Sequence, residues 1–143
     1  MRNFLTEDEK LKPYSPWLQR MDSVIGGEAC TKYRPDVLYT GTDLWIQVEC
    51  DENQHTGHSY SCEERRISEI FDETGGKSLA VIRWNPDNTR TCKIPFAQRL
   101  ELLRDTILEI ISRVPEHPIE VTYMFYDHDN ENICKHLPIR HVA

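Results

Sequence analysis

The sequence lacks any hydrophobic run that approaches the roughly 20 apolar residues a membrane-spanning helix needs. Its first residues are rich in charge, and they contain no apolar segment of the kind that a signal peptide carries. We therefore expect an intracellular protein, cytoplasmic or nuclear, that is neither secreted nor held in a membrane. Hydrophobic residues make up 38% of the 143 residues, which is enough for one core and one domain.

The five cysteines do not form the pattern of a disulfide framework. Their number is odd, and no CxxC pair occurs among Cys30, Cys50, Cys62, Cys92 and Cys134. We therefore expect reduced thiols, with Cys50 and Cys92 as buried apolar side chains. Zinc accepts sulfur and imidazole ligands, which leaves a zinc site as an alternative, although the spacing of its residues is irregular. The residues of that alternative site are Cys30, His55, His58 and Cys62.

Positive charge is also in short supply. The chain has 17 Lys and Arg residues against 24 Asp and Glu residues, and its formal net charge is -7. Affinity for a nucleic-acid duplex depends mainly on cations that neutralise phosphates, so this balance argues against a protein that coats nucleic acid. The same balance counts against a nuclease but does not exclude one, because a nuclease gathers carboxylates around metal ions and presents its Lys and Arg residues on a separate face.

Hydrophobic patterning predicts an α/β fold. Strands are expected over residues 21–25, 37–40, 44–49, 79–84 and 119–126, and helices over residues 16–20, 62–73 and 95–113. Residues 41–43 (GTD) suit the tight turn of a hairpin between the second and third strands. The order of elements predicts a mixed β-sheet of about four to five strands flanked by helices. We assign residues 1–13 to an N-terminal tail and residues 14–143 to a single domain, in which the segment after Asp127 shows no clear pattern.

Two carboxylates flank the predicted hairpin at the same open end. Asp36 precedes its first strand, and Glu49 ends its second strand. Phosphodiester hydrolysis at neutral pH uses divalent ions, and carboxylate oxygens are ligands that such ions prefer. We therefore expect Asp36 and Glu49 to share a metal ion, with the backbone carbonyl of Cys50 as a further ligand. As isolated features, an Asp in a turn and a Glu at a strand end are more often ordinary surface residues.

A polar cluster follows Glu49 directly. Its sequence is Asp51-Glu52-Asn53-Gln54-His55. His55 is a candidate general base or acid, or a group that orients the attacking water. Arg65 and Arg66 on the next predicted helix are placed to contact phosphate or to hold the carboxylates in position. A wider basic face for the phosphate backbone, unless these charges are simply solvated, would draw on Lys77, Arg83, Arg90, Lys93 and Arg99.

An ordered set of short motifs runs along the chain. It comprises Arg34-Pro35-Asp36, residues 48–55 (VECDENQH), residues 60–63 (YSCE) with Arg66, Gly75-Gly76, and residues 82–87 (IRWNPD). In this order the motifs resemble a family of largely uncharacterised proteins encoded by giant DNA viruses and some microbial eukaryotes. That family is similar to the very-short-patch-repair-like branch of the PD-(D/E)XK superfamily, which has the restriction endonuclease fold. The resemblance covers residues 17–126.

The resemblance implies a restriction endonuclease-like core and a Mg-dependent endonuclease that hydrolyses phosphodiester bonds in DNA, with Mn as a substitute metal. The metal ligands that the resemblance implies are Asp36 and Glu49, to which we add the Cys50 carbonyl and, as a third carboxylate, Asp51. The commonest form of the signature has a lysine two positions after the acidic residue, where this chain has Asp51. A downstream histidine serves in the active site of the repair-like branch, and His55 matches it. We therefore assign catalysis to Asp36, Glu49, Asp51, Gln54 and His55, and contacts with the nucleic acid to Arg34, Arg65, Arg66, Lys77 and Arg83.

Two alternatives to the nuclease stay open at this point. One is a non-catalytic binding module for nucleic acid or protein that keeps the nuclease fold, which the absent lysine and the acidic net charge would allow. The other is a zinc-stabilised interaction domain. For the nuclease itself the expected partner is DNA, with RNA left open. A homodimer formed through the apolar stripe of residues 100–111 would explain how so small a domain cuts both strands of a duplex.

Overall fold

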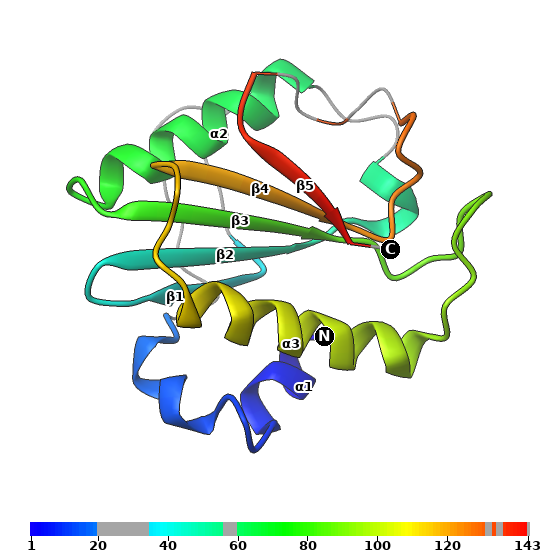
Figure 1. Ribbon diagram of the computed structural model, residues 1–143, viewed down its shortest axis with the longest axis horizontal. Coiled ribbons are helices and arrows are strands. Elements are labelled where there is room, and N and C mark those ends of the chain that lie inside the picture. Colours follow the sequence, from blue (N-terminus) through cyan, green and yellow to red (C-terminus); the bar gives the residue numbers. More distant parts are fainter. Residues whose placement is uncertain (20–34, 56–59, 131–132, 134–135, 143) are drawn as a thin grey trace.

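The computed structural model describes residues 1–19, 35–55, 60–130, 133 and 136–142. Its centre is a sheet of five strands in the order β1-β2-β3-β4-β5 (Figure 1). The strands are β1 (Val37–Thr40), β2 (Leu44–Cys50), β3 (Ser78–Trp84), β4 (Ile119–Met124) and β5 (Ile139–Val142). β1 runs antiparallel to β2, as predicted for the hairpin, and every later pair is parallel. The predicted α/β fold with a mixed sheet is thereby confirmed.

Helices cover both faces of this sheet (Figure 1). α2 (Tyr60–Glu73) buries Ile70 against one face, and α3 (Phe96–Ser112) buries Ile107 against the other. Both helices match the predicted spans within two residues, and the apolar stripe of α3 packs on its own sheet. Side chains alternate between the faces along a strand, so the odd-numbered residues of β2 and β3 point toward α2 and the even-numbered residues toward α3.

The N-terminal residues that the sequence indicates as a tail are part of the folded unit. α1 (Arg2–Glu7) and the 3-10 helix η1 (Lys12–Trp17) follow one another, and Leu5 and Leu11 are each 2% exposed in the core on the α3 face. The charged run between the two leucines hides this packing from a sequence analysis, because most of its side chains stay exposed. The N-terminal segment therefore enlarges the core.

The sequence predicts two short elements near the N-terminus, a helix over residues 16–20 and a strand over residues 21–25. η1 ends at Trp17, so the helix expected over residues 16–20 is present only in its first part. Leu18 then pairs with Tyr39 of β1, which turns the chain along the edge of the sheet instead of continuing the helix. The strand expected over residues 21–25 lies outside the described residues.

The C-terminal part of the sheet also departs from the expectation. β4 ends at Met124, two residues early, because Phe125 has a φ of 65°, a left-handed backbone conformation that cannot continue a strand. The chain then returns to add β5, which the polar composition of the C-terminal segment does not predict. Within the described part of the chain, no helix is long and apolar enough to cross a membrane.

Arg99 of α3 is a fully buried cation in this fold. Its guanidinium lies 5.0 Å from the centre of the Phe125 ring, and the side chain is 0% exposed. It donates to the backbone carbonyls of Asn85, Asp87, Cys92 and Ile94 and to the side chain of Asn88. Because all these acceptors belong to the connection between β3 and α3, Arg99 holds the loop of residues 85–94 in one shape.

We predict that Arg99→Met lowers the free energy of unfolding by about 3 kcal/mol, because several buried acceptors lose their donor at once. Urea unfolding of the full chain measures this change. Arg104→Met is the matched control on the same helix, since Arg104 pairs with the side chains of Asp8 and Asp105 and not with the carbonyls of the loop, and it should cost less than Arg99→Met. Equal losses in the two variants would show that Arg99 does not organise the loop.

Candidate functional site

The strand directions bring four segments of the chain to one edge of the sheet. β2, β3 and β4 are parallel and end at this edge, whereas the antiparallel strand β1 begins there. In Figure 1 it is the right-hand edge, toward which the arrowheads of β2, β3 and β4 point. Open α/β sheets bind ligands beyond the carboxyl ends of their parallel strands, so this carboxyl edge is where a site is expected.

A row of polar and ionisable side chains crosses the sheet just inside the carboxyl edge. Glu49 of β2 pairs in register with Arg83 of β3. Arg83 pairs in turn with Tyr123 of β4, and Tyr123 pairs with His141 of β5. The antiparallel register of β1 and β2 continues outward to place Asp36 opposite Glu49. Residues paired in register share a face, which here is the face that α2 covers.

Asp36 and Glu49 meet at the same end of the hairpin, which is the position predicted for them. The Asp36 Oδ2 atom accepts a hydrogen bond from the backbone nitrogen of Cys50 at 2.8 Å. Glu49 is 7% exposed, and its Oε1 atom accepts from Gln47 Nε2 at 3.0 Å. Burial and the nearby Asp36 charge raise the pKa of the Cys50 thiol to about 11, so this thiol is protonated at neutral pH. Cys50 is therefore no candidate for a nucleophile.

Asp51 lies at the centre of a buried ion-pair network. Arg83 donates to both of its carboxylate oxygens, from Nε to Oδ2 at 2.6 Å and from Nη2 to Oδ1 at 2.9 Å. The hydroxyl of Tyr126 also donates to Oδ2. Arg83 Nη1 reaches Glu63 Oε2 of α2 at 2.6 Å, and Glu63 accepts from Arg66 at 2.8 Å as well. The network thus ties the end of β2 to the first turns of α2 through the central strand.

The turn after Asp51 has an unusual backbone conformation. Asn53 and Gln54 have φ values of 51° and 56°, in the left-handed region that few residues other than glycine adopt. Their backbone nitrogens donate to side chains of the β3–α3 loop, from Asn53 to Asp87 at 2.6 Å and from Gln54 to Asn85 at 3.4 Å. Backbone strain of this kind persists where surrounding contacts hold it, and such places are often functional sites.

Gln54 links this turn to the segment after β4. Its Nε2 atom donates to Asp127 Oδ2 at 3.2 Å, and its Oε1 atom accepts from the backbone nitrogen of Asp127 at 2.6 Å. Hydrogen bonds to Asp127, led by the one from the Thr91 hydroxyl, hold the pKa of that carboxyl well below its usual range. The turn η2 (Glu52–His55) ends one residue later, and the side chain of His55 lies outside the described residues. Gln54 therefore supports the turn that precedes His55.

The structure separates the cations that the sequence analysis assigns to nucleic acid. Arg65 is exposed on α2, whereas Arg66 is half-buried in an ion pair within that helix. Lys77 precedes β3, roughly 20 Å from the carboxyl edge, because a strand rises about 3.3 Å per residue. Arg83 is 4% exposed and binds two carboxylates, so an internal role suits it better than a phosphate contact. Arg34 lies outside the described residues.

A pocket of about 550 Å³ opens at the carboxyl edge. It is lined by Arg90, Thr91, Cys92, Lys93, Ile94, Tyr126, His128 and Asp129. Arg90 and Lys93 are exposed there, and Arg90 pairs with Asp129 at 2.6 Å. Tyr126 connects the pocket to Asp51 through its hydroxyl. A polyanion could therefore contact cations in this pocket close to the acidic residues at the strand ends.

Sequence reasoning does not identify every side chain that builds this site. Gln47 stands out in the sequence because it is an amide within an apolar strand. A polar residue in such a strand is expected to be buried with a specific partner, which here is Glu49. Glu63 appears in the sequence only as the last residue of the motif of residues 60–63, and Tyr126 has no signal. Their contacts with Arg83 and Asp51 arise from the packing of α2 and of the segment after β4 on the central strands. Asn85 hydrogen-bonds near the site, from its Nδ2 atom to the carbonyls of Phe125 and Asp87.

Among the described residues, no group of three His, Cys, Asp or Glu side chains is arranged to hold a metal ion. Asp36 and Glu49 are two carboxylates, to which a backbone carbonyl would add a third oxygen. Comparisons with protein-family models, with curated proteins and with solved structures find no match for this chain. Its function is therefore inferred from the geometry of the carboxyl edge and from the sequence motifs.

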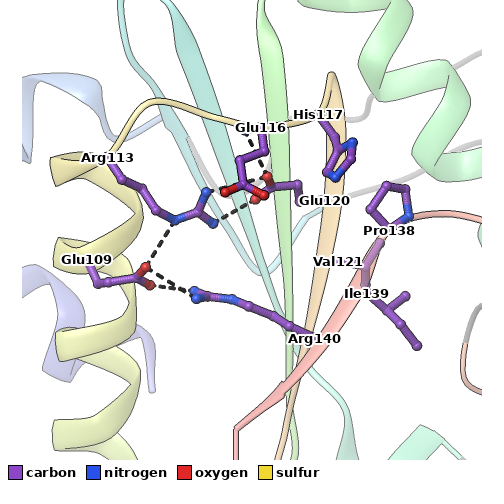
Figure 2. A pocket seen from close by; sticks show the side chains of 9 residues that line it. All are labelled: Glu109, Arg113, Glu116, His117, Glu120, Val121, Pro138, Ile139 and Arg140. Carbon is purple, nitrogen blue, oxygen red and sulfur yellow. Dashed lines mark hydrogen bonds and ion pairs between the residues drawn. The ribbon is translucent and has the colours of Figure 1, made fainter.

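Another pocket, of about 310 Å³, lies at the opposite edge of the sheet between α3, β4 and β5 (Figure 2). Its charged side chains pair with one another. Arg140 of β5 donates to the two carboxylate oxygens of Glu109 at 2.5 and 3.2 Å. Arg113 pairs with Glu109 at 3.0 Å and with Glu120 at 2.6 Å. Because both guanidinium groups are engaged, this arrangement is a clamp that fastens the edge strand β5 to α3.

We predict that acid weakens this clamp. Hydrogen bonds from Arg140 lower the pKa of Glu109, and those from Arg113 lower the pKa of Glu120. A carboxylate with a lowered folded-state pKa stabilises the fold above its unfolded pKa, and this contribution is lost as the pH falls through the folded pKa. Arg140→Met should therefore cost less than about 1 kcal/mol at neutral pH, as for a solvent-screened pair, and still less near pH 3.

Urea unfolding of the parent and of Arg140→Met at the two pH values measures this effect. The matched control is the same substitution in a Glu109→Gln background, where no titrating partner of Arg140 remains in the pair and the cost should not depend on pH. An equal cost of Arg140→Met at neutral and acidic pH in the parent background would contradict the prediction.

Proposed function

We propose that this protein is a metal-dependent endonuclease that hydrolyses phosphodiester bonds in DNA. One observation carries the proposal. The carboxylate of Asp36 lies against the backbone of Cys50, at the strand end where Glu49 is opposite Asp36 in register. Two carboxylates from antiparallel strands are thereby neighbours at the sheet edge, as the resemblance to the PD-(D/E)XK superfamily requires. A five-stranded mixed sheet with helices on both faces is compatible with a restriction endonuclease-like core.

The available donors suit a hard divalent cation. Asp36 and Glu49 offer carboxylate oxygens and Cys50 would add its carbonyl oxygen, which are ligands that Mg²⁺ and Mn²⁺ accept. Mg²⁺ usually keeps several water molecules, so one or two carboxylates are enough to bind it. When bound, such an ion activates a water molecule and neutralises charge on the scissile phosphate. The burial of Glu49 strengthens its attraction for a cation, because the local dielectric constant is lower than in water.

His55 is the proposed group for proton transfer. An imidazole changes its charge near neutral pH, and a histidine at this place in the motif would serve where a lysine is absent. The backbone before it is held by the hydrogen bonds of Asn53 and Gln54 to neighbouring loops.

DNA would approach the carboxyl edge along the exposed cations. Arg90 and Lys93 line the pocket there, and Arg65 is exposed on α2. These exposed cations, of which Arg90 also pairs with Asp129, offer contacts with phosphates, and a chain of net charge -7 needs such contacts in order to bind a polyanion. RNA carries the same phosphates and remains a second substrate to compare. A homodimer, in the cytoplasm or the nucleus, would bring two sites to the two strands of a duplex.

We predict that Asp36→Asn and Glu49→Gln each slow the cleavage of supercoiled plasmid by at least about 100-fold, because each removes a charged metal ligand. The assay uses the purified chain with Mg²⁺, Mn²⁺ or EDTA, on supercoiled plasmid, on single-stranded DNA and on RNA. Glu52→Gln is the matched control, because Glu52 is an exposed acid in the adjacent turn. This variant should cleave plasmid at the rate of the parent. Intact substrates under every metal, with variants that bind DNA as well as the parent does, would favour a non-catalytic binding module.

We predict that His55→Ala lowers kcat by about 10²–10⁴-fold, the usual loss for a general acid or base, and leaves the affinity for Mn²⁺ near that of the parent. Single-turnover cleavage at saturating Mn²⁺ measures the rate, and calorimetry measures the affinity. His128→Ala is the control, because His128 is an exposed histidine at the same edge. A loss of Mn²⁺ affinity equal to the loss of rate would identify His55 as a metal ligand instead.

A further inference from the structure

Asp51 is the third carboxylate near Asp36 and Glu49, and its surroundings differ from those of a metal ligand. We propose that Asp51 does not bind the metal ion of the proposed nuclease and instead anchors Arg83, the residue paired in register with Glu49 on the neighbouring strand. The inference rests on the proposed function, because it divides the acidic residues of that site into metal ligands and an anchor. Arg83 is then a positioning residue, which acts through Asp51 and Glu63.

The geometry of the Asp51–Arg83 pair supports the anchor role. The planar guanidinium meets the carboxylate as a fork, with Nε to Oδ2 at 2.6 Å and Nη2 to Oδ1 at 2.9 Å. Such two-point contacts are the strongest hydrogen bonds between these groups and fix their relative orientation. The Tyr126 hydroxyl donates to Oδ2 from another side. Both carboxylate oxygens therefore accept strong donors in a place where Asp51 is only 4% exposed.

The position of Arg83 makes it relevant to the metal site. Arg83 is the partner of Glu49 in the parallel register of β2 and β3, and adjacent strands lie about 4.8 Å apart. Its positive charge would repel a metal ion held by Glu49 unless carboxylates compensate it. Asp51 and Glu63 supply that compensation, each at 2.6 Å from a guanidinium nitrogen. Because Asp51 and Glu63 neutralise its charge, Arg83 can lie near a metal site without lowering the affinity of that site for the metal ion.

The same contacts give Arg83 its positioning role. Through Asp51 it fixes the residue from which the turn toward His55 begins, and through Glu63 it fixes the first turns of α2. Removing the guanidinium would leave the Asp51 charge near the metal site without its cationic partner and would release the end of β2 from the central strand. We therefore expect the two measurable properties to change in opposite directions, with tighter metal binding and slower cleavage. A substitution that only disturbs the fold would weaken both.

The experiment measures Mn²⁺ binding by electron paramagnetic resonance and counts the water molecules on bound Mn²⁺ by water-proton relaxation. Arg83→Met should bind Mn²⁺ roughly tenfold more tightly, since one positive charge is removed near a divalent ion, and should cleave plasmid about 100-fold more slowly. The paired variant Asp51→Leu/Arg83→Met removes both charges and should bind Mn²⁺ within about threefold of the parent, with the same number of bound waters. Asp36→Ala is the positive control, in which about one more water should bind.

Two results would overturn the inference while leaving the proposed nuclease intact. One is a paired variant that gains a metal-bound water and loses at least about tenfold in Mn²⁺ affinity, as expected if Asp51 is a ligand. The other is an Arg83→Met variant that cleaves like the parent. The paired variant keeps the test informative if Arg83→Met alone does not fold. Absence of Mn²⁺ binding by the parent chain would instead overturn the proposed function, and this inference with it.

Discussion

Arg83 brings a full positive charge into the central strand of the sheet, where removal from water is costly unless carboxylates reach it. Asp51, directly after β2, and Glu63 of α2 meet this need. The ion pairs therefore decide how the end of β2, the first turns of α2 and the central strand fit together. The rest of the carboxyl edge is built outward from this arrangement, with Tyr126 completing the contacts of Asp51 from the end of β4.

Arg99 has a comparable task on the other face of the sheet. Its guanidinium donates hydrogen bonds to the carbonyls of the β3–α3 loop. The backbone carbonyl of Arg99 accepts a hydrogen bond from the Trp84 ring nitrogen at 3.1 Å. Asn85 lies between the two cations in the chain, fully buried, and connects the β3–α3 loop to the segment after β4. Positive φ values at Asn53, Gln54 and Phe125 are held by this polar framework. This framework of hydrogen bonds holds the loops at the carboxyl edge in one conformation.

The local parts of this structure are the parts that sequence patterns predict. The hairpin of β1 and β2 is joined by a short turn, so the meeting of Asp36 with Glu49 follows from the strand boundaries alone. β3 and α3 are long and strongly patterned, and their spans are confirmed. By contrast, β5 is a short edge strand with little burial, and its place depends on pairing with β4 and on the clamp formed by Arg140. No local pattern of residues encodes such an element.

By itself, the sequence determined the α/β class, the hairpin, the two long helices, and the presence of two acidic residues at one strand end. Only the tertiary structure decided that Asp51 pairs with Arg83, that Lys77 lies far from the carboxyl edge, and that Leu5 and Leu11 belong to the core. The physical reason is the distance along the chain. Asp51 and Arg83 are 32 positions apart in the sequence, and their contact depends on the parallel register of β2 and β3, which the packing of α2 on both strands sets.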